Sequence, residues 1–356
     1  MSKQVAIVCN YSLNPNRIGG MDRFFVAFDQ KLKQANYDVT WFFTDYTVFD
    51  FYKNLNIKTN KNRDVTDFFL QDLAHNARNY DLLITHFVEL CIPFFKKVKQ
   101  FGIQKTIAVD HNPRPLEGFS WLKILKNYLK GFFYSPYIDL FIGVSHYTKK
   151  HILKDYGFFL NHKTLVIHNG IDTDVFKKRI DENFGKFIVT SHLRPSKGIQ
   201  DLIQAVGILP IELQKLLIID VFGEGPMEAE LKQMVVDAKL LNVFNFMGSS
   251  SNLNVLFCSY SYTIQPTYME CFSLSILESL SANVPVITTT VGGNLEVVVD
   301  HKNGFTFEPK AINDIASILQ NILSKNISIQ SNVSDNIQQK YNLSQMVENH
   351  FKYLQI

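Results

Sequence analysis

The sequence predicts an α/β protein built from two doubly wound domains. Three observations support this fold class: the length, the alternation of short apolar runs with amphipathic stretches, and a second round of that alternation after a polar stretch. At 356 residues the chain is long enough for two domains that each bury a core. The predicted domains cover residues 1–170 and 171–339, and a helix over about 340–356 is expected to cross back onto the first domain.

Short apolar runs in the first half are typical of buried parallel strands, because they are rich in β-branched and aromatic residues. They cover residues 4–9, 39–44, 82–86, 105–109 and 140–144. Helices are predicted between them, over residues 22–35, 66–78 and 122–133.

The second half repeats the pattern. Strands are predicted over residues 187–191, 216–222, 245–247, 262–264 and 284–288, and helices over 199–209, 227–238 and 275–282. Ligands of such sheets bind beyond the carboxyl ends of the strands. We therefore expect a cleft between two Rossmann-like halves to hold the ligand.

The composition excludes several classes of protein. An apolar fraction of 46% and a charged fraction of 19% are those of a globular chain. No apolar run approaches the roughly 18–20 residues of a membrane span, and the chain begins a strand too soon for a signal peptide. The cysteines, Cys9, Cys91, Cys258 and Cys271, have no metal-ligand or disulfide spacing. A reducing cytoplasm is the expected location.

Charge is divided unevenly along the chain. Residues 1–170 hold 22 Lys and Arg against 14 Asp and Glu, whereas the remainder holds 14 against 19, so the two parts carry +8 and −5. This asymmetry suggests that the two domains face different partners. No recognised nucleic-acid-binding motif accompanies the positive charge, so no nucleic acid partner is expected.

Glu270 and Glu278 flank the point where a loop turns into a helix. The unpaired N–H groups and the dipole of a helix start favour a phosphate, and carboxylates bind hydroxyl groups. A sugar attached to a diphosphate requires both kinds of partner. A glycosidase acid–base pair is disfavoured, because eight helical positions span ~12 Å and such pairs lie roughly 5–9.5 Å apart.

One structural alternative stays open for Glu278. Ser275 and Glu278 have the Ser-x-x-Glu spacing of a capping box, in which the glutamate only ties off the start of the helix.

Two further segments suit phosphate binding. Gly19 and Gly20 lie between the first strand and a helix, where glycine lets the backbone approach a ligand closely. Arg194 and Lys197 follow the first strand of the second domain, where a departing diphosphate needs cations. A plain strand-to-helix turn and a solvated turn are the respective alternatives.

Taken together, these motifs resemble the retaining glycosyltransferases of family 4, which have the GT-B fold. The resemblance runs nearly from end to end. Its motifs keep the family's order at residues 19–23, 109–115, 143–148, 166–176, 222–226, 246–248, 270–278 and 291–296.

The resemblance implies a retaining hexosyltransferase that moves a sugar from a nucleotide sugar, most often a UDP sugar, to a glycan or polyprenyl-linked acceptor. Surface polysaccharide or lipopolysaccharide biosynthesis is the expected context. The second domain would bind the donor and the first would face the acceptor, with no other cofactor. A sugar-nucleotide epimerase of the same fold and a catalytically silent sugar-nucleotide- or glycan-binding protein are the alternatives.

The resemblance also assigns roles to residues. Glu270 would bind hydroxyls of the donor sugar and Glu278 those of the ribose, and Lys197 with Arg194 would neutralise the departing nucleotide. His111 would lie near the sugar. Further donor contacts would come from the glycine loops and from backbone N–H groups: Gly19, Gly20, Gly248, Phe272, Ser273 and Leu274. Where the family has an arginine five positions before the lysine, this chain has His192, so whether Arg194 or His192 fills that role stays open.

No metal is predicted. Asp172 and Asp174 have the Asp-x-Asp spacing of metal-dependent transferases, but they follow the 166–172 motif and are expected to begin a helix. His86 and His111 have no third ligand at recognisable spacing.

Two basic and aromatic segments, residues 91–99 and 121–133, raise the question of membrane contact. The favoured interpretation of 121–133 is a helix that buries its apolar face on the sheet. Because the first half carries +8, peripheral contact with an anionic membrane on the inner face of the cell is the second hypothesis.

Overall fold

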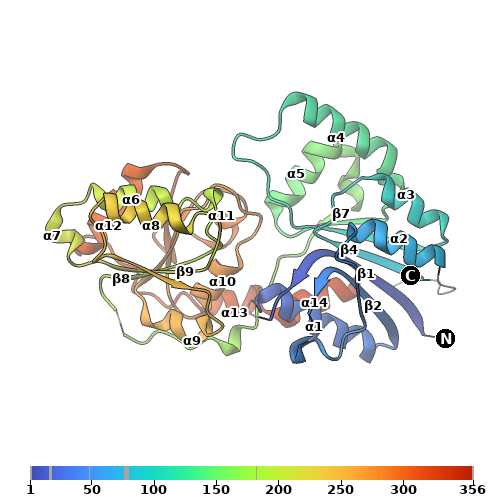
Figure 1. The fold of residues 1–356 in the computed structure, drawn as a ribbon, viewed down its shortest axis with the longest axis horizontal. Helices are drawn as coiled ribbons and strands as arrows, with labels where there is room; N and C mark the ends of the chain where they lie inside the picture. The colour runs from blue at the N-terminus through green and yellow to red at the C-terminus, as the bar shows by residue number, and fades with distance from the viewer. Residues whose placement is uncertain (1, 16–17, 48, 76–79, 182, 355–356) are drawn as a thin grey trace. The chain divides into compact units, whose positions relative to one another are not determined.

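The computed structural model describes residues 2–15, 18–47, 49–75, 80–181 and 183–354 (Figure 1). The chain forms two units, one of Met1–Gly170 with Leu343–Ile356 and the other of Ile171–Asn342. Each unit contains one sheet whose paired strands are parallel, and helices connect the strands. This confirms the predicted α/β class with two doubly wound domains.

The sheet of the first unit has seven strands in the order β3-β2-β1-β4-β5-β6-β7. Their bounds are β1 Lys3–Leu13, β2 Tyr37–Tyr46, β3 Ile57–Thr59, β4 Leu82–His86, β5 Lys105–Asp110, β6 Leu140–Gly143 and β7 Thr164–Val166. The winding reverses between β1 and β4, so the loops that follow these strands and β5 occupy the edge where ligands of such sheets bind.

The helices of the first unit are α1 Gly20–Gln34, α2 Val65–His75, α3 Pro93–Gln100, α4 Trp121–Tyr134, α5 His146–Tyr156 and the C-terminal α14 Leu343–Lys352. Short 3-10 helices cover Asp50–Tyr52, Ser135–Tyr137 and Phe158–Lys163. The C-terminal helix contacts α1, where the ring of His350 lies 4.9 Å from that of Phe24. Residues 76–78 of the predicted helix 66–78 lie outside the described residues.

The sheet of the second unit has six strands in the order β10-β9-β8-β11-β12-β13. The strands are β8 Lys186–Thr190, β9 Ile218–Phe222, β10 Phe244–Gly248, β11 Tyr262–Gln265, β12 Val286–Thr289 and β13 Gly304–Phe307. The winding reverses between β8 and β11. The helices are α6 Ile199–Gly207, α7 Ile211–Gln214, α8 Glu228–Asp237, α9 Leu253–Leu256, α10 Leu274–Ser281, α11 Asn294–Val297, α12 Ile312–Leu323 and α13 Asp335–Lys340.

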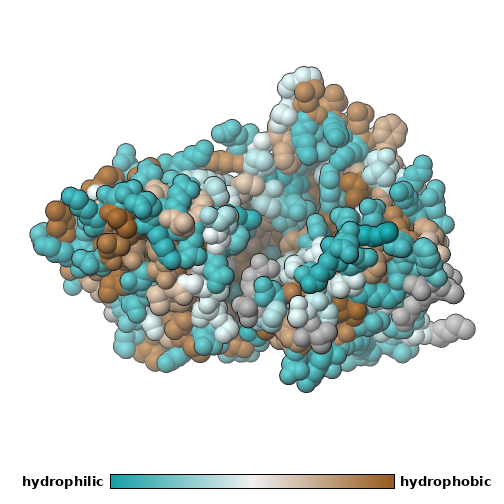
Figure 2. Space-filling model, viewed as in Figure 1, coloured by the Kyte–Doolittle hydropathy of each residue, from teal (hydrophilic) through white to brown (hydrophobic). Residues whose placement is uncertain are grey.

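Helix α4 does not bury its apolar face, so the favoured interpretation of residues 121–133 is wrong. Only Asn127 and Gly131 are buried on this helix. The reason is Gly131, where a β-carbon would lie 1.9 Å from the carbonyl oxygen of Tyr156 at the end of α5. Because α4 contacts its neighbour through this small residue, the large apolar side chains are exposed, as Figure 2 shows over α4: Trp121, Leu122, Leu125, Tyr128, Leu129, Phe132 and Phe133.

The segment 91–99 corrects a second expectation. Phe94 and Phe95 are buried in the core of the first unit, so this segment presents lysines such as Lys96 and Lys97 at its surface but not its aromatic rings. Among the described residues, no helix has both the length and the apolar character needed to cross a bilayer.

Candidate active site

In the second unit, the loops that follow β8 and β11 are bonded to each other. The backbone N–H of Tyr268 donates to the carbonyl of Ser196 at 2.8 Å. A β-carbon at Gly198, which has a φ of +69°, would lie 1.8 Å from the carbonyl oxygen of Pro266. Glycine is therefore required for this close approach, which brings the two loops together at the edge where the sheet's winding reverses.

Lys197 and Glu270 meet between these loops. The Lys197 Nζ donates to the Glu270 Oε2 at 3.0 Å, and the side chains are only 12% and 19% exposed. Gly292, in the loop after β12, contacts the backbone of Glu270. A β-carbon at Gly292 would lie 1.9 Å from the Glu270 carbonyl oxygen. The structure thus holds one cation and one carboxylate in contact at the carboxyl end of the sheet.

Helix α10 begins a few residues after Glu270, with Ser273 as its N-cap. The Ser273 Oγ accepts from the N–H of Ile276 at 3.4 Å and from the Gln265 Nε2 at 2.6 Å. The first N–H groups of any helix, here those of Leu274 and Ser275, have no acceptor within the helix. Together with the helix dipole, they favour an anion beside Glu270.

The capping-box alternative for Glu278 is wrong. The cap is Ser273 rather than Ser275, because the Ser273 hydroxyl accepts from the N–H of Ile276, which is therefore the third helical position. Glu278 lies a turn further along α10 and is half-buried.

The other donor-side candidates lie on neighbouring loops of the same unit. Arg194 caps the short 3-10 helix Pro195–Lys197, and both Arg194 and His192 are exposed. Gly248 ends β10 with a φ of +68°, and its carbonyl accepts from the N–H of Gly223 at 2.8 Å. The candidates of the second unit therefore share one edge, at the carboxyl ends of β8, β10 and β11.

In the first unit, Gly19 and Gly20 form the start of α1. Gly19 is the N-cap and its N–H donates to the Asp22 Oδ2 at 2.8 Å. Asp22 is buried and also accepts from the hydroxyls of Tyr11, at 3.1 Å, and Tyr52. Asp22 therefore fixes the conformation of the glycine turn.

His111 follows β5 and is held by two neighbours from the end of β4. Its Nε2 lies 3.0 Å from the His86 Nδ1, and its ring stacks on Phe87 with centroids 4.2 Å apart. At this distance the two ring nitrogens are hydrogen-bonded to each other. Sequence reasoning had considered the two histidines together but missed Phe87.

The pKa values of the buried histidines are lowered. Burial lowers the pKa of His111 to about 3 and that of His350 to about 4. Burial, together with His111 and His350, also lowers the pKa of His86 well below its ordinary value. All three imidazoles are therefore neutral at pH 7.

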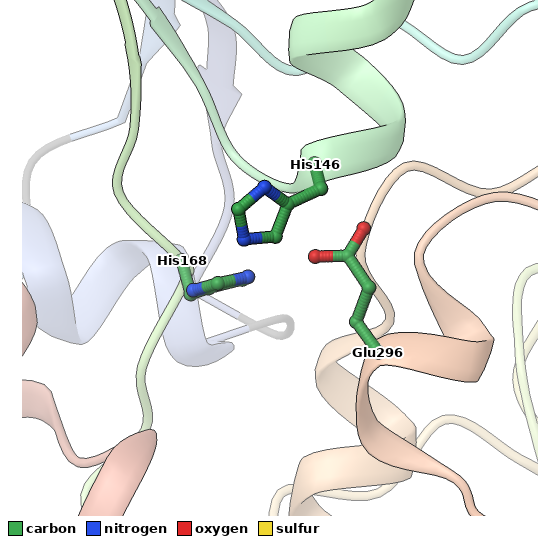
Figure 3. Close-up of side chains that lie close together, drawn as sticks. All are labelled: His146, His168 and Glu296. Atoms are coloured by element: carbon green, nitrogen blue, oxygen red, sulfur yellow. The ribbon is translucent and has the colours of Figure 1, made fainter.

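The first unit contains a second pair of neighbouring imidazoles. Figure 3 shows His146 at the start of α5 and His168 on the segment after β7, with ring centroids 5.5 Å apart. Glu296, labelled in the same figure, lies on α11 of the second unit, where its carbonyl accepts from the Tyr341 hydroxyl at 3.0 Å. Within either unit taken alone, the described residues gather no group of three His, Cys, Asp or Glu ligands. Asp172 is at the N-cap position of the 3-10 helix Thr173–Val175. This confirms that Asp172 and Asp174 lie at the start of a helix.

Two parallel doubly wound sheets are the architecture of the GT-B fold that the motifs led us to expect. The family model described as Glycosyl transferases group 1 matches residues 170–340, and the model described as Glycosyltransferase Family 4 matches residues 18–175. The chain therefore belongs to the glycosyltransferases that these two models describe, which confirms the resemblance to family 4 seen in its motifs.

Curated relatives match part of the chain. An uncharacterized glycosyltransferase of Methanocaldococcus jannaschii is 29% identical over 198 residues, which cover 54% of this chain and 53% of that protein. The N-acetyl-alpha-D-glucosaminyl L-malate synthase of Bacillus anthracis is 29% identical over 153 residues, which cover 40% and 39%. The chain thus spans about half or less of the length of these relatives.

Solved structures share the fold over the whole chain. Anabaena HepE in complex with UDP and glucose has a TM-score of 0.78 at 17% identity, with 99% of both chains covered. The apo form of the lipopolysaccharide outer core galactosyltransferase WaaB has a TM-score of 0.72 at 14% identity, with 98% of both covered.

The buried histidines predict how stability depends on pH. The unfolded chain takes up protons near pH 6.5, whereas folded His111 and His350 stay neutral until about pH 3 and 4. The stability that they contribute above pH 6.5 is therefore lost as the pH falls, by up to ~1.4 kcal/mol per pH unit for each histidine. We expect His350→Phe to flatten the fall in melting temperature between pH 7.5 and 5, measured by scanning calorimetry.

The exposed His162 supplies the control. His162→Gln should leave the pH dependence as in the unaltered protein. Equal slopes for all three proteins would show that His350 does not resist protonation in the folded state.

Proposed function

We propose that the protein transfers a sugar from a nucleotide sugar to a glycan or lipid-linked glycan acceptor, with retention of the anomeric configuration. The observation that supports this most is the contact between Lys197 and Glu270 beside the start of α10. It combines a cation and helix N–H groups for a diphosphate with a carboxylate for sugar hydroxyls.

In the absence of donor, Lys197 and Glu270 neutralise each other. A diphosphate offers Lys197 more negative charge than one carboxylate does, and sugar hydroxyls offer Glu270 new hydrogen bonds. Donor binding therefore separates the pair. Lys197, with Arg194 as a second cation, then stabilises the charge that develops as the nucleoside diphosphate leaves. Glu278, further along α10, accepts hydrogen bonds from the ribose.

Catalysis in this proposal needs neither a protein nucleophile nor a divalent metal. The acceptor hydroxyl attacks the anomeric carbon from the face that the nucleotide leaves and gives its proton to the departing phosphate oxygen. The bond between the sugar and the phosphate breaks, the nucleoside diphosphate is released, and the configuration is retained. His111 hydrogen-bonds the sugar as a neutral imidazole, because burial lowers its pKa to about 3. The glycine turn at Gly19 and Gly20 lets backbone N–H groups approach the phosphates.

The similar structures support a choice of substrates. HepE is described with UDP and glucose, and WaaB as a lipopolysaccharide outer core galactosyltransferase. We therefore propose a UDP sugar as the donor and the synthesis of surface polysaccharide or lipopolysaccharide as the context.

A donor panel tests this function. With UDP, GDP and ADP sugars in the presence of EDTA, we expect transfer or slow hydrolysis of a UDP sugar. Glu270→Ala should lower kcat about 100-fold or more, since it removes contacts to the reacting sugar. Glu278→Ala should chiefly raise the Kd for UDP, about tenfold for the loss of one to two hydrogen bonds. Glu230→Ala, at an exposed position on α8, is the matched control.

Other outcomes of the panel separate the alternatives. Inversion of a sugar carbon within the intact nucleotide sugar identifies an epimerase. Binding of UDP sugars without any turnover identifies a silent binding protein. Either result contradicts the proposed transfer.

The exposed face of α4 supports peripheral membrane contact. Trp121 is 72% exposed and Phe132 is 62% exposed, and Phe158 in the neighbouring 3-10 helix is 76% exposed. Lys126 on α4, with Lys150 and Lys154 on α5, adds positive charge at the surface. Apolar side chains bordered by lysines suit an anionic lipid interface. We propose that this unit binds the inner face of the cell membrane.

Co-sedimentation with vesicles of anionic and zwitterionic lipids at low salt tests this contact. Binding to anionic vesicles is expected, and Trp121→Ser with Phe132→Ser should lower it at least fivefold. The matched control is Ile211→Ser with Leu241→Ser, at exposed positions of the second unit. Absence of binding by the unaltered protein, or equal loss in both double variants, would contradict the proposal.

A further inference from the structure

A pocket of about 290 Å³ lies in the first unit, where β4 and β5 end. Its walls include Phe87 and Asn112 from the loops after these strands, Phe119 before α4, and Lys123 and Asn127 on α4. The volume lies at the lower end of the roughly 300–1,000 Å³ of small-molecule sites. The pocket therefore suits a single ring rather than an extended oligosaccharide.

Asn127 is an unusual residue for its position. It lies on the inward side of α4 and is 2% exposed. Its Oδ1 is buried and has no hydrogen-bond partner among the described residues. A buried carbonyl-type oxygen without a donor is destabilising, so its place in the wall of a pocket points to a ligand that supplies an O–H or N–H.

Aromatic rings form other parts of the wall. Phe87 lines the pocket and also stacks on His111, with ring centroids 4.2 Å apart. Its φ of +60° is an uncommon backbone conformation for a bulky residue, of the kind that concentrates at binding sites. Phe119 adds a second, half-buried ring. Apolar ring faces combined with an amide oxygen match a sugar, which presents C–H groups and hydroxyls.

The charged groups around the pocket sum to zero, because three carboxylates are matched by three cations, one of which is Lys123. Arg114 donates to Asp110 at 2.9 Å and to Asp155 at 2.7 Å, and all three are buried. Glu89 accepts from the Lys130 Nζ at 2.5 Å. Since these charges cancel, the pocket favours a neutral ligand over a phosphate.

We propose that this pocket binds one neutral sugar ring of the acceptor, with a ring hydroxyl donating to the Asn127 Oδ1. Phe87 lines the pocket and stacks on His111. The bound ring therefore lies near His111, the residue proposed to hydrogen-bond the donor sugar. The assignment to the acceptor rests on the proposed function, whereas sugar binding itself does not.

Saturation-transfer NMR with a panel of methyl hexopyranosides, in the absence of donor, tests the binding. At least one hexoside should bind the full chain. Asn127→Leu keeps the side-chain size but removes the acceptor, and Phe119→Ala removes a wall that is not part of the core; each should weaken binding at least tenfold. Asn161→Leu, at an exposed position of the same unit, should leave it unchanged.

Three results would overturn the proposal: no hexoside binds the unaltered protein, both pocket variants bind as the unaltered protein does, or inorganic phosphate displaces the bound hexoside. Unfolding of Asn127→Leu, seen as a lowered melting temperature, leaves Phe119→Ala to decide.

The kinetics separate this proposal from the proposed function. If a hexoside binds through Asn127 but no donor supports transfer, the transferase proposal fails and the sugar pocket stands. If transfer occurs and Asn127→Leu leaves the acceptor KM within twofold of its original value, the acceptor assignment is wrong.

Discussion

The ion pair between Lys197 and Glu270 is the interaction on which the rest of the candidate donor site depends. It exists because two glycines permit backbone contacts that no other residue allows, Gly198 against Pro266 and Gly292 against Glu270. These contacts fix the loops after β8 and β11 side by side at the carboxyl edge of the sheet. The loop after β11 leads directly into α10. The carboxylate of Glu270, the ammonium group of Lys197 and the first N–H groups of α10 therefore lie close together.

The first unit offers a different chemistry, of neutral and apolar groups. Its buried imidazoles are uncharged, and the buried charges around Arg114 are paired. Helix α4 contributes to two surfaces, because Asn127 faces inward to the pocket while residues such as Trp121 face solvent. These environments agree with the proposed roles, in which the second unit binds the donor and the first unit binds the acceptor.

Much of the fold could be predicted, because buried strands and amphipathic helices have clear periods. The strands β3, β7 and β13 were not predicted, since three or four residues show too little of a period. The predicted burial of the apolar face of α4 was wrong, because a hydrophobic stripe does not show which element packs against it. The contact of Gly131 with Tyr156 determines which side of α4 faces its neighbour. In the candidate site, the motif order singled out Glu270 and Lys197, but their mutual hydrogen bond and the unpartnered oxygen of Asn127 depend on contacts distant in sequence.

The most direct test of the account is calorimetric titration of UDP into Glu270→Gln and Lys197→Met variants. If Glu270 competes with the diphosphate for Lys197, Glu270→Gln should bind UDP at least as tightly as the unaltered protein while losing transfer. Lys197→Met should bind UDP at least tenfold more weakly, as expected for the loss of a charge-assisted contact. Equal weakening of UDP binding by both substitutions would contradict the exchange of partners, and unchanged binding in Lys197→Met would place the diphosphate elsewhere.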